Sequence, residues 1–195
     1  MSKPINFLQI DRYWFLTWTT YGTWLPGDER GFVGVAPNEF GRMVEHNQPG
    51  TPLAAPRPAL RRSAEARMNS EPVVFHIDHA EALLSQFQET TTYRHWLLVA
   101  AGIMHTHLHA LIGVPGDPDP DKILGDLKAY GSRRLNRTWT CPGDDTWWTT
   151  GGSKRKLSDA PSVEAAVNYI RHQPNPLLIW TREDGLVVSA RQPPQ

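Results

Sequence analysis

Cysteine is nearly absent from the sequence, because Cys141 is the single thiol among 195 residues. One thiol cannot form an internal disulfide or share a zinc ion with a second cysteine, so neither explains the fold. The sequence also lacks a run of about 18 apolar residues that could cross a bilayer. Its first residues do not show the basic and then apolar pattern of a signal peptide. We therefore predict a cytoplasmic protein that does not contact a membrane.

The sequence has no net charge either, since 20 basic side chains are balanced by 20 acidic ones. Neutrality argues against a protein that coats polyanions indiscriminately, although a local basic face can still exist. The hydrophobic share of 39% is typical of a globular protein, and 195 residues are enough to bury one sizeable core. Residues 1–195 are therefore predicted to form a single domain.

Hydrophobic spacing predicts alternating strands and helices along the chain. Residues 22–58 are rich in Gly, Pro and Asn, which predicts a long irregular insertion after the first strand. Asp78 and Ser162 stand where helix N-caps are expected. We expect strands over residues 12–21, 96–104, 107–114 and 150–158, and helices over residues 59–68, 78–93, 121–139 and 162–173.

This order of elements predicts an α+β fold of the ferredoxin-like type, with a split βαβ unit. The sheet is expected to be mostly antiparallel and covered by helices on one face. The strands over 96–104 and 107–114 are expected to pair as a hairpin, with His105 and Thr106 at their junction.

Three histidines stand at alternate positions of an apolar stretch, IMHTHLHALIGV, residues 103–114. Side chains alternate along a strand, so His107 and His109 share a face with Cβ atoms about 7 Å apart. Both rings can then converge on one ion, while Leu108 and Ala110 face the helix-covered core. Histidines on a half-exposed strand can also serve no metal, and the sequence leaves that alternative open.

Tyr169 and Gln173 are four residues apart in the last predicted helix, so they share one face of it. If this face meets the histidines, the Gln173 carboxamide can complete a two-nitrogen, one-oxygen ligand set for Mg²⁺ or Mn²⁺. A free phenol, with a pKa of about 10, is a poor nucleophile unless the target phosphate is polarised. A tyrosine in an amphipathic helix is more often a packing residue, so its chemical role is a hypothesis.

Basic residues outnumber acidic ones by four between residues 121 and 156. A polyanion could bind there, and Trp139, Trp147 and Trp148 could stack on unpaired bases. A solvated basic helix face is the commoner outcome of such a pattern. The candidate nucleic-acid-binding residues are Lys128, Arg133, Arg134, Arg137, Lys154, Arg155 and Lys156.

Three stretches resemble the HUH superfamily of single-tyrosine transposases. The histidines lie in MHTHLHALI, which resembles the signature M-P-N-H-U-H-L-L-[IV], where U is hydrophobic. The tyrosine lies in NYIRHQPNPL, which resembles the family's Tyr followed four residues later by Asn or Gln and then Pro. The early stretch TWTTYGTWLPGDERG is similar to a bacterial branch close to the REP-associated tyrosine transposases. His105 and Thr106 depart from the signature, because Pro and Asn are usual there.

The resemblance implies a metal-dependent nuclease that recognises a hairpin in single-stranded DNA. Tyr169 would attack a phosphodiester, form a 5′-phosphotyrosine link and free a 3′-OH, and the reverse reaction would reseal the strand without ATP. His107, His109 and Gln173 would hold Mg²⁺ or Mn²⁺. Some relatives are dimers that exchange the tyrosine helix and others are monomers, so a homodimer is one of two expectations.

Two other functions are compatible with the sequence. The chain could be a domesticated, non-catalytic regulator that binds DNA hairpins. It could also be a small metallohydrolase that activates water with His105, His107 and His109. If Tyr169 is not the nucleophile, Tyr130 is the next candidate, followed by Tyr13, Tyr21 and Tyr93.

Overall fold

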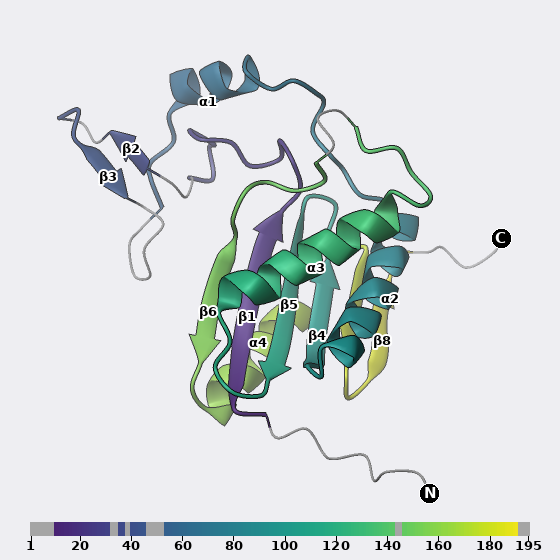
Figure 1. Cartoon of the computed structure of the whole chain (residues 1–195). Coiled ribbons are helices and arrows are strands. Elements are labelled where there is room, and N and C mark those ends of the chain that lie inside the picture. Colours follow the sequence, from purple (N-terminus) through teal and green to yellow (C-terminus); the bar gives the residue numbers. More distant parts are fainter. Residues whose placement is uncertain (1–9, 32–34, 38–39, 46–52, 143–145, 191–195) are drawn as a thin grey trace, which may run out of the picture.

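The computed structural model describes residues 10–31, 35–37, 40–45, 53–142 and 146–190, and a six-stranded sheet forms its centre (Figure 1). Every neighbouring pair of strands in this sheet is antiparallel. From one edge to the other, the strands are β6 (Ser153–Leu157), β1 (Arg12–Thr19), β5 (His107–Val114), β4 (Leu97–Ile103), β7 (Leu178–Thr181) and β8 (Gly185–Ser189).

Helices cover both faces of this sheet. Two of them, α2 and α3, pack against each other on one face, and α4 lies on the other (Figure 1). No helix in the described part of the chain is long and apolar enough to span a membrane. The helices are α1 (Pro58–Glu65), α2 (Ile77–Tyr93), α3 (Pro120–Leu135) and α4 (Ala160–Arg171).

The alternation of side chains along β1 separates the two faces. Trp14, Leu16 and Trp18 are buried in the main core beneath α2 and α3. Phe15 and Thr17, the residues between them, point to the opposite face, where α4 lies. One strand therefore supplies the core on one side and a half-buried surface on the other.

The predicted α+β fold is confirmed. Since β5 lies between β1 and β4, the unit β1–α2–β4 is a split βαβ. The hairpin of β4 and β5 forms as predicted. One face carries α2 and α3, as expected, whereas α4 covers the face that the sequence left open for the histidines.

Two predicted helix caps are wrong. The residue before α4 is Asp159, whose carboxylate accepts a hydrogen bond of 2.7 Å from the backbone N–H of Ser162. Ser162 therefore lies inside the helix. At α2 the N-cap is His76, and Asp78 lies in the first turn, where a negative charge is favourable beside the positive end of the helix.

The predicted insertion contains more regular structure than its composition indicates. An antiparallel pair, β2 (Val35–Pro37) and β3 (Met43–Glu45), lies within it. The short helix α1 begins at Pro58, at the end of the predicted insertion. Residues 32–34, 38–39 and 46–52 lie outside the described part of the chain.

The sequence pattern did not predict the last two strands. β7 pairs with β4 and buries Leu178 and Ile179, and β8 extends the sheet beyond it. Each has only four or five residues, which is too short for a clear period-two pattern.

Gly131 allows α2 and α3 to approach each other closely. A Cβ atom at this position would lie 3.1 Å from Cδ2 of Leu83 and 3.3 Å from a ring atom of Trp148. Glycine usually weakens a helix, because its backbone loses more conformational freedom. At this position the packing between the helices explains its presence.

Replacing Gly131 should therefore destabilise the protein. We expect Gly131→Leu to lower the free energy of unfolding by about 1–3 kcal/mol through overpacking. Gly125 lies in the same helix, is exposed and has open space around it. Gly125→Ala should raise the free energy of unfolding by about 0.5–1 kcal/mol through helix propensity. Urea denaturation measures both values, and equal effects of the two substitutions would contradict this account.

Candidate active site

His107 and His109 lie side by side at the start of β5, on the face covered by α4. Their ring centroids are 5.2 Å apart and the planes are nearly perpendicular, at 81°. His107 is half-buried, whereas His109 is only 4% exposed. The two imidazoles therefore share a face, as the alternation of the strand predicts.

Tyr169 reaches the same place from α4. Its ring centroid lies 5.3 Å from that of His109, and its side chain remains accessible, with the residue 53% exposed. The next residue, Ile170, is fully buried against the sheet. Its Cγ2 would lie 3.1 Å from a Cβ at Gly102, which pairs with His109 in the sheet. The missing side chain of Gly102 thus allows α4 to approach the sheet beside His109.

Gln173 follows Tyr169 by one helical turn and lies near both imidazoles. Its side-chain nitrogen donates to the backbone carbonyl of Tyr169 at 3.2 Å. Its side chain favours the charged forms of His107 and His109, which raises their pKa values relative to burial alone. The structure therefore brings together the four residues that the sequence singled out, all from one chain.

Two side chains of β1 hold His109 in place. Thr17 Oγ1 and Nδ1 of His109 share a hydrogen bond of 2.7 Å. Phe15 stacks on His109, with centroids 5.5 Å apart, and meets the edge of Tyr169 at 5.8 Å. The sequence pattern did not single out either residue. The alternation of β1 could have placed them on this face, but the register of β1 against β5 was needed to place them at His109.

Both imidazoles are shifted toward their neutral forms. The pKa of His109 is lowered to about 4, mainly by burial and further by the charge of His107, while Gln173 opposes the shift. Burial also lowers the pKa of His107. Gln173 opposes this shift, and the positive charge of Arg30 adds to it. Neutral imidazoles are the form that binds metal ions, so no deprotonation is needed near pH 7.

The donor set fits a divalent ion. Nε2 of His109 is buried and makes no hydrogen bond within the described residues, while Thr17 occupies Nδ1. A buried nitrogen without a partner is costly, and a metal-bound histidine usually engages its other ring nitrogen in a hydrogen bond. Nε2 of His109, a ring nitrogen of His107 and the carboxamide of Gln173 make up the ligand set that the sequence predicts for Mg²⁺ or Mn²⁺.

The third histidine does not join this pair. His105 lies in the turn between β4 and β5, where its Nδ1 is 3.0 Å from the backbone oxygen of Phe75. Among the described residues, no three His, Cys, Asp or Glu side chains are grouped to hold a metal ion. A metallohydrolase site built on His105, His107 and His109 therefore has no support from the geometry.

Several residues predicted to contact nucleic acid have structural contacts instead. The Lys128 amine donates to the backbone oxygens of Thr149, at 2.8 Å, and Gly151. Burial lowers the pKa of this amine to about 8. The predicted base-stacking role of Trp147 and Trp148 is wrong, because both rings are buried in the main core, at 2% and 7% exposure.

The remaining basic residues divide between the two faces of the sheet. Lys154 pairs with Asp121 of α3, and the Lys156 amine lies over the ring of Trp14, so both belong to the face of α2 and α3. Arg155 lies between them on β6 and pairs in register with Phe15, which places it on the face of Tyr169. The basic residues at the end of α3, on the other face, are Arg133, Arg134 and Arg137. DNA contact by any of these residues stays a prediction.

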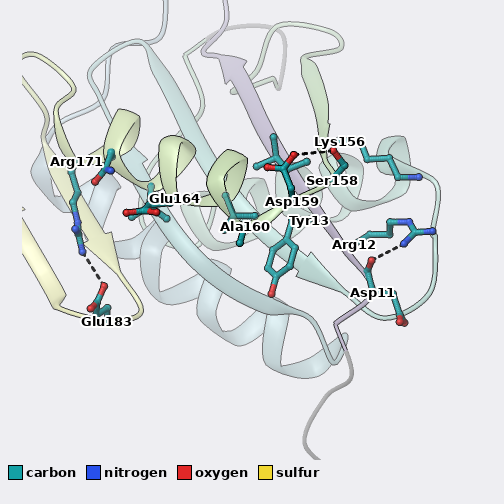
Figure 2. Close-up of a pocket in the computed structure, with 14 residues that line it drawn as sticks. Asp11, Arg12, Tyr13, Lys156, Ser158, Asp159, Ala160, Glu164, Arg171 and Glu183 are labelled. Carbon is teal, nitrogen blue, oxygen red and sulfur yellow. Dashed lines mark hydrogen bonds and ion pairs between the residues drawn. The ribbon is translucent and has the colours of Figure 1, made fainter.

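A hollow lies along α4 on the same face of the sheet as the candidate site. It has a volume of about 810 Å³ and follows the flank of α4, between Tyr13, Glu164 and Arg171 (Figure 2). Its walls carry charges of both signs, and none of the four candidate residues lines it. Tyr169 itself is 53% exposed, so a large substrate can reach its phenol from solvent.

A family comparison matches more than half of the chain to a family of transposases. Residues 66–173 match the model of the family described as "Transposase IS200 like", and this range contains both histidines, Tyr169 and Gln173. A solved REP-associated tyrosine transposase bound to a REP hairpin is 12% identical, with a TM-score of 0.43 over 88% of this chain and 71% of that one. A transposase structure from Deinococcus radiodurans R1 is 16% identical, with a TM-score of 0.40 over 90% and 99%. No curated protein matches the chain.

The metal-free protein should lose stability through His109 in mild acid. Its pKa is about 4 in the folded protein and 6.5 in the unfolded chain, so the unfolded state binds more protons between these values. The stability that the protein gains from keeping His109 neutral is fully present above pH 6.5 and is lost as the pH falls toward 4. We expect the free energy of unfolding to fall by about 3 kcal/mol across this pH range.

Urea unfolding in the presence of a chelator, at several pH values across this window, measures the effect. The control is His109→Gln, which cannot titrate and should show a shallower loss. Equal pH slopes for the wild type and the variant would contradict the assignment to His109.

Proposed function

The chain belongs to the IS200-like transposase family, and we propose that it cleaves and rejoins single-stranded DNA with Tyr169 as the nucleophile. The observation that carries this proposal is the meeting of an accessible phenol with a buried imidazole. Tyr169 is 53% exposed and lies against His109, whose Nε2 has no hydrogen bond within the described residues.

The reaction is a transesterification. The Tyr169 oxygen attacks the phosphorus, so the Oη–P bond forms and the P–O3′ bond breaks. The phenol loses its proton and the leaving 3′ oxygen gains one. The products are a 5′-phosphotyrosine link and a free 3′-OH, and the energy of the phosphodiester is kept in the covalent link. The reverse attack by a 3′-OH therefore reseals a strand without ATP.

His107, His109 and Gln173 would hold the divalent ion, Mg²⁺ or Mn²⁺. Such an ion would polarise a phosphoryl oxygen and offset the negative charge that develops during attack. The chain's own residues orient the participants. Thr17 holds the His109 ring, and Phe15 packs against both His109 and Tyr169, which limits the directions in which the phenol can point.

The proposed substrate is a single strand next to a DNA hairpin. An unpaired strand is flexible enough for one of its phosphates to reach a phenol on an open surface. The preference for a hairpin rests on the family's motifs. Since both histidines and the tyrosine come from one chain, the reaction needs no exchange of helices, and a homodimer stays a prediction.

Loss of the Tyr169 hydroxyl should abolish the covalent product. A single-stranded hairpin oligonucleotide labelled at its 3′ end is incubated with Mn²⁺ and separated on a denaturing gel. The wild type should give a protein–DNA adduct and Tyr169→Phe none. Tyr93→Phe is the matched control, because Tyr93 is 71% exposed at the end of α2, on the other face of the sheet.

The other outcomes separate the competing functions. An adduct that persists in Tyr169→Phe removes this residue as the nucleophile and makes Tyr130 the next candidate. Tight binding of the hairpin by the wild type, with no cleavage in Mg²⁺ or Mn²⁺, indicates a non-catalytic regulator.

Metal binding should depend on the hydrogen bond that orients His109. We expect Thr17→Val to weaken Mn²⁺ binding by about 10–100-fold, because the ring loses its partner at Nδ1. Titration calorimetry of the DNA-free protein measures the affinity. Thr92→Val, at an exposed position of α2, is the control and should bind Mn²⁺ like the wild type. Equal affinities of all three proteins would contradict the role of Thr17, and no binding by the wild type would refute the metal site.

A further inference from the structure

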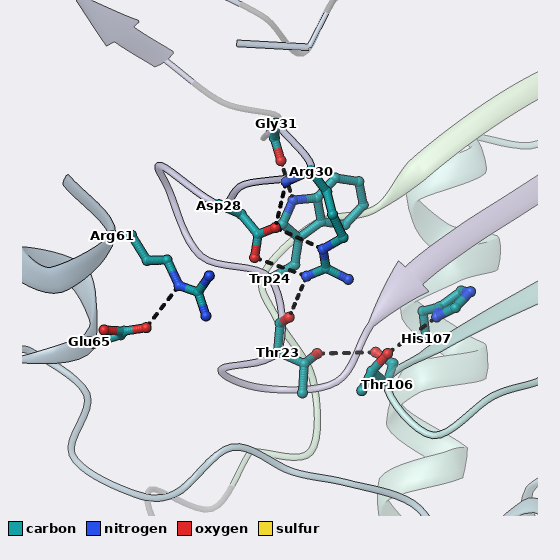
Figure 3. A network of polar contacts seen from close by, with 9 residues as sticks. All are labelled: Thr23, Trp24, Asp28, Arg30, Gly31, Arg61, Glu65, Thr106 and His107. Carbon is teal, nitrogen blue, oxygen red and sulfur yellow. Dashed lines mark hydrogen bonds and ion pairs between the residues drawn. The ribbon is translucent and has the colours of Figure 1, made fainter. Parts of the chain in front are cut away.

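A loop after β1 presents one arginine beside the candidate active site (Figure 3). Arg30 donates from Nε and Nη2 to the two carboxylate oxygens of Asp28, at 2.7 and 2.9 Å. The Asp28 side chain is only 5% exposed, whereas that of Arg30 is 55% exposed. This hydrogen bonding lowers the pKa of Asp28, so the carboxylate stays charged. A buried carboxylate therefore holds an exposed guanidinium in one orientation.

Two further contacts restrict the same guanidinium. It lies over the ring of Trp24, 5.6 Å from the centroid, and the Trp24 indole donates to the backbone oxygen of Gly31 at 2.7 Å. Its Nη2 also donates to the backbone oxygen of Thr23 at 2.9 Å. Nη1 makes no hydrogen bond to the part of the chain that the structure describes. The two N–H groups of this nitrogen are the donors left for another molecule.

Hydrogen bonds tie this loop to the strand that carries the histidines. The hydroxyl groups of Thr20 and Thr23 both donate to the backbone oxygen of Thr106, each at 3.1 Å. Thr106 directly precedes His107, and its own hydroxyl is 3.3 Å from Nδ1 of that histidine. The positive charge of Arg30 is close enough to lower the His107 pKa. The loop thus has a fixed place at the His107 side of the site.

We infer that Arg30 binds a phosphate of the DNA strand that enters the Tyr169 site, with Asp28 and Trp24 as its positioning residues. A guanidinium makes strong charge-assisted hydrogen bonds to phosphate oxygens, and one whose orientation is already restricted loses little side-chain entropy on binding. Nη1 of Arg30 then offers two N–H donors to a phosphate on the His107 side of the site, because the other donors of the guanidinium are held by Asp28 and Thr23. This inference rests on the proposed function and names the residue that anchors its substrate.

The first test is the salt dependence of DNA binding, measured by fluorescence anisotropy with a labelled single-stranded hairpin in the presence of a chelator. Each phosphate contact on a single strand contributes about 0.7 to the slope of log affinity against log salt. The variant Asp28→Asn/Arg30→Gln removes both charges and retains amide groups that can hydrogen-bond. If Arg30 binds one phosphate, the salt slope of this variant should be smaller than that of the wild type by about 0.7. Arg12→Gln is the control, an exposed arginine at the far end of β1, and should keep the wild-type slope.

The second test is the rate of adduct formation with Mn²⁺, and it uses Arg30→Lys as well. This variant keeps the charge but loses the two-point pairing with Asp28 that orients the side chain, so it should retain the salt slope. It should form adduct about 100-fold more slowly, because the phosphate is misplaced. Arg12→Gln should stay within about twofold of the wild type. A merely structural ion pair would change thermal stability without changing the salt slope.

The outcomes separate this inference from the proposed function. If the wild type forms no adduct but the double variant loses salt slope, cleavage is refuted and Arg30 remains a phosphate-binding residue. If the wild type forms adduct and the double variant keeps the wild-type slope, the inference is overturned and the proposed function stands. Equal loss of slope in Arg12→Gln also overturns it, because the effect would then be one of general charge.

Discussion

The register of β1 against β5 is the constraint on which the rest of the site depends. Thr17 stands opposite His109, and Thr19 opposite His107. Because side chains alternate along a strand, a slip of one residue would turn both histidines toward the core of α2 and α3. It would also separate His109 from the hydroxyl that occupies its Nδ1. The apolar face of β1, with Trp14, Leu16 and Trp18 buried, makes such a slip costly.

Burial and exposure are divided among different residues at this site. His109 is buried and neutral, which suits a metal ligand, whereas Tyr169 is exposed, which suits attack on a large substrate. A guanidinium with free N–H donors comes from a separate loop, where Asp28 and Trp24 hold Arg30. In this arrangement the proposed nucleophile, ligands and phosphate anchor come from three segments of the chain. Each can be held rigidly by its own surroundings.

Features that follow from a regular spacing of residues along the chain could be predicted. Features that depend on contacts between distant segments could not. The helix α2 and the strand β5 follow from hydrophobic spacing, and the pairing of Tyr169 with Gln173 follows from helical geometry. Trp147 was misassigned because composition does not say which tryptophans the core will bury. Arg30 was overlooked because Asp28 and Glu29 precede it, so no local surplus of positive charge marks it.

The sequence by itself determined the α+β class, the alternation that puts His107 and His109 on one face, and the motifs that resemble single-tyrosine transposases. These properties are local, since each depends on residues a few positions apart. Only the tertiary structure decided that α4 lies beside those histidines and that Thr17 and Phe15 hold His109. It alone also placed Arg30 at the rim of the site. Such contacts join residues far apart in the chain, and they form only when strand register and close packing at Gly102 bring the segments together.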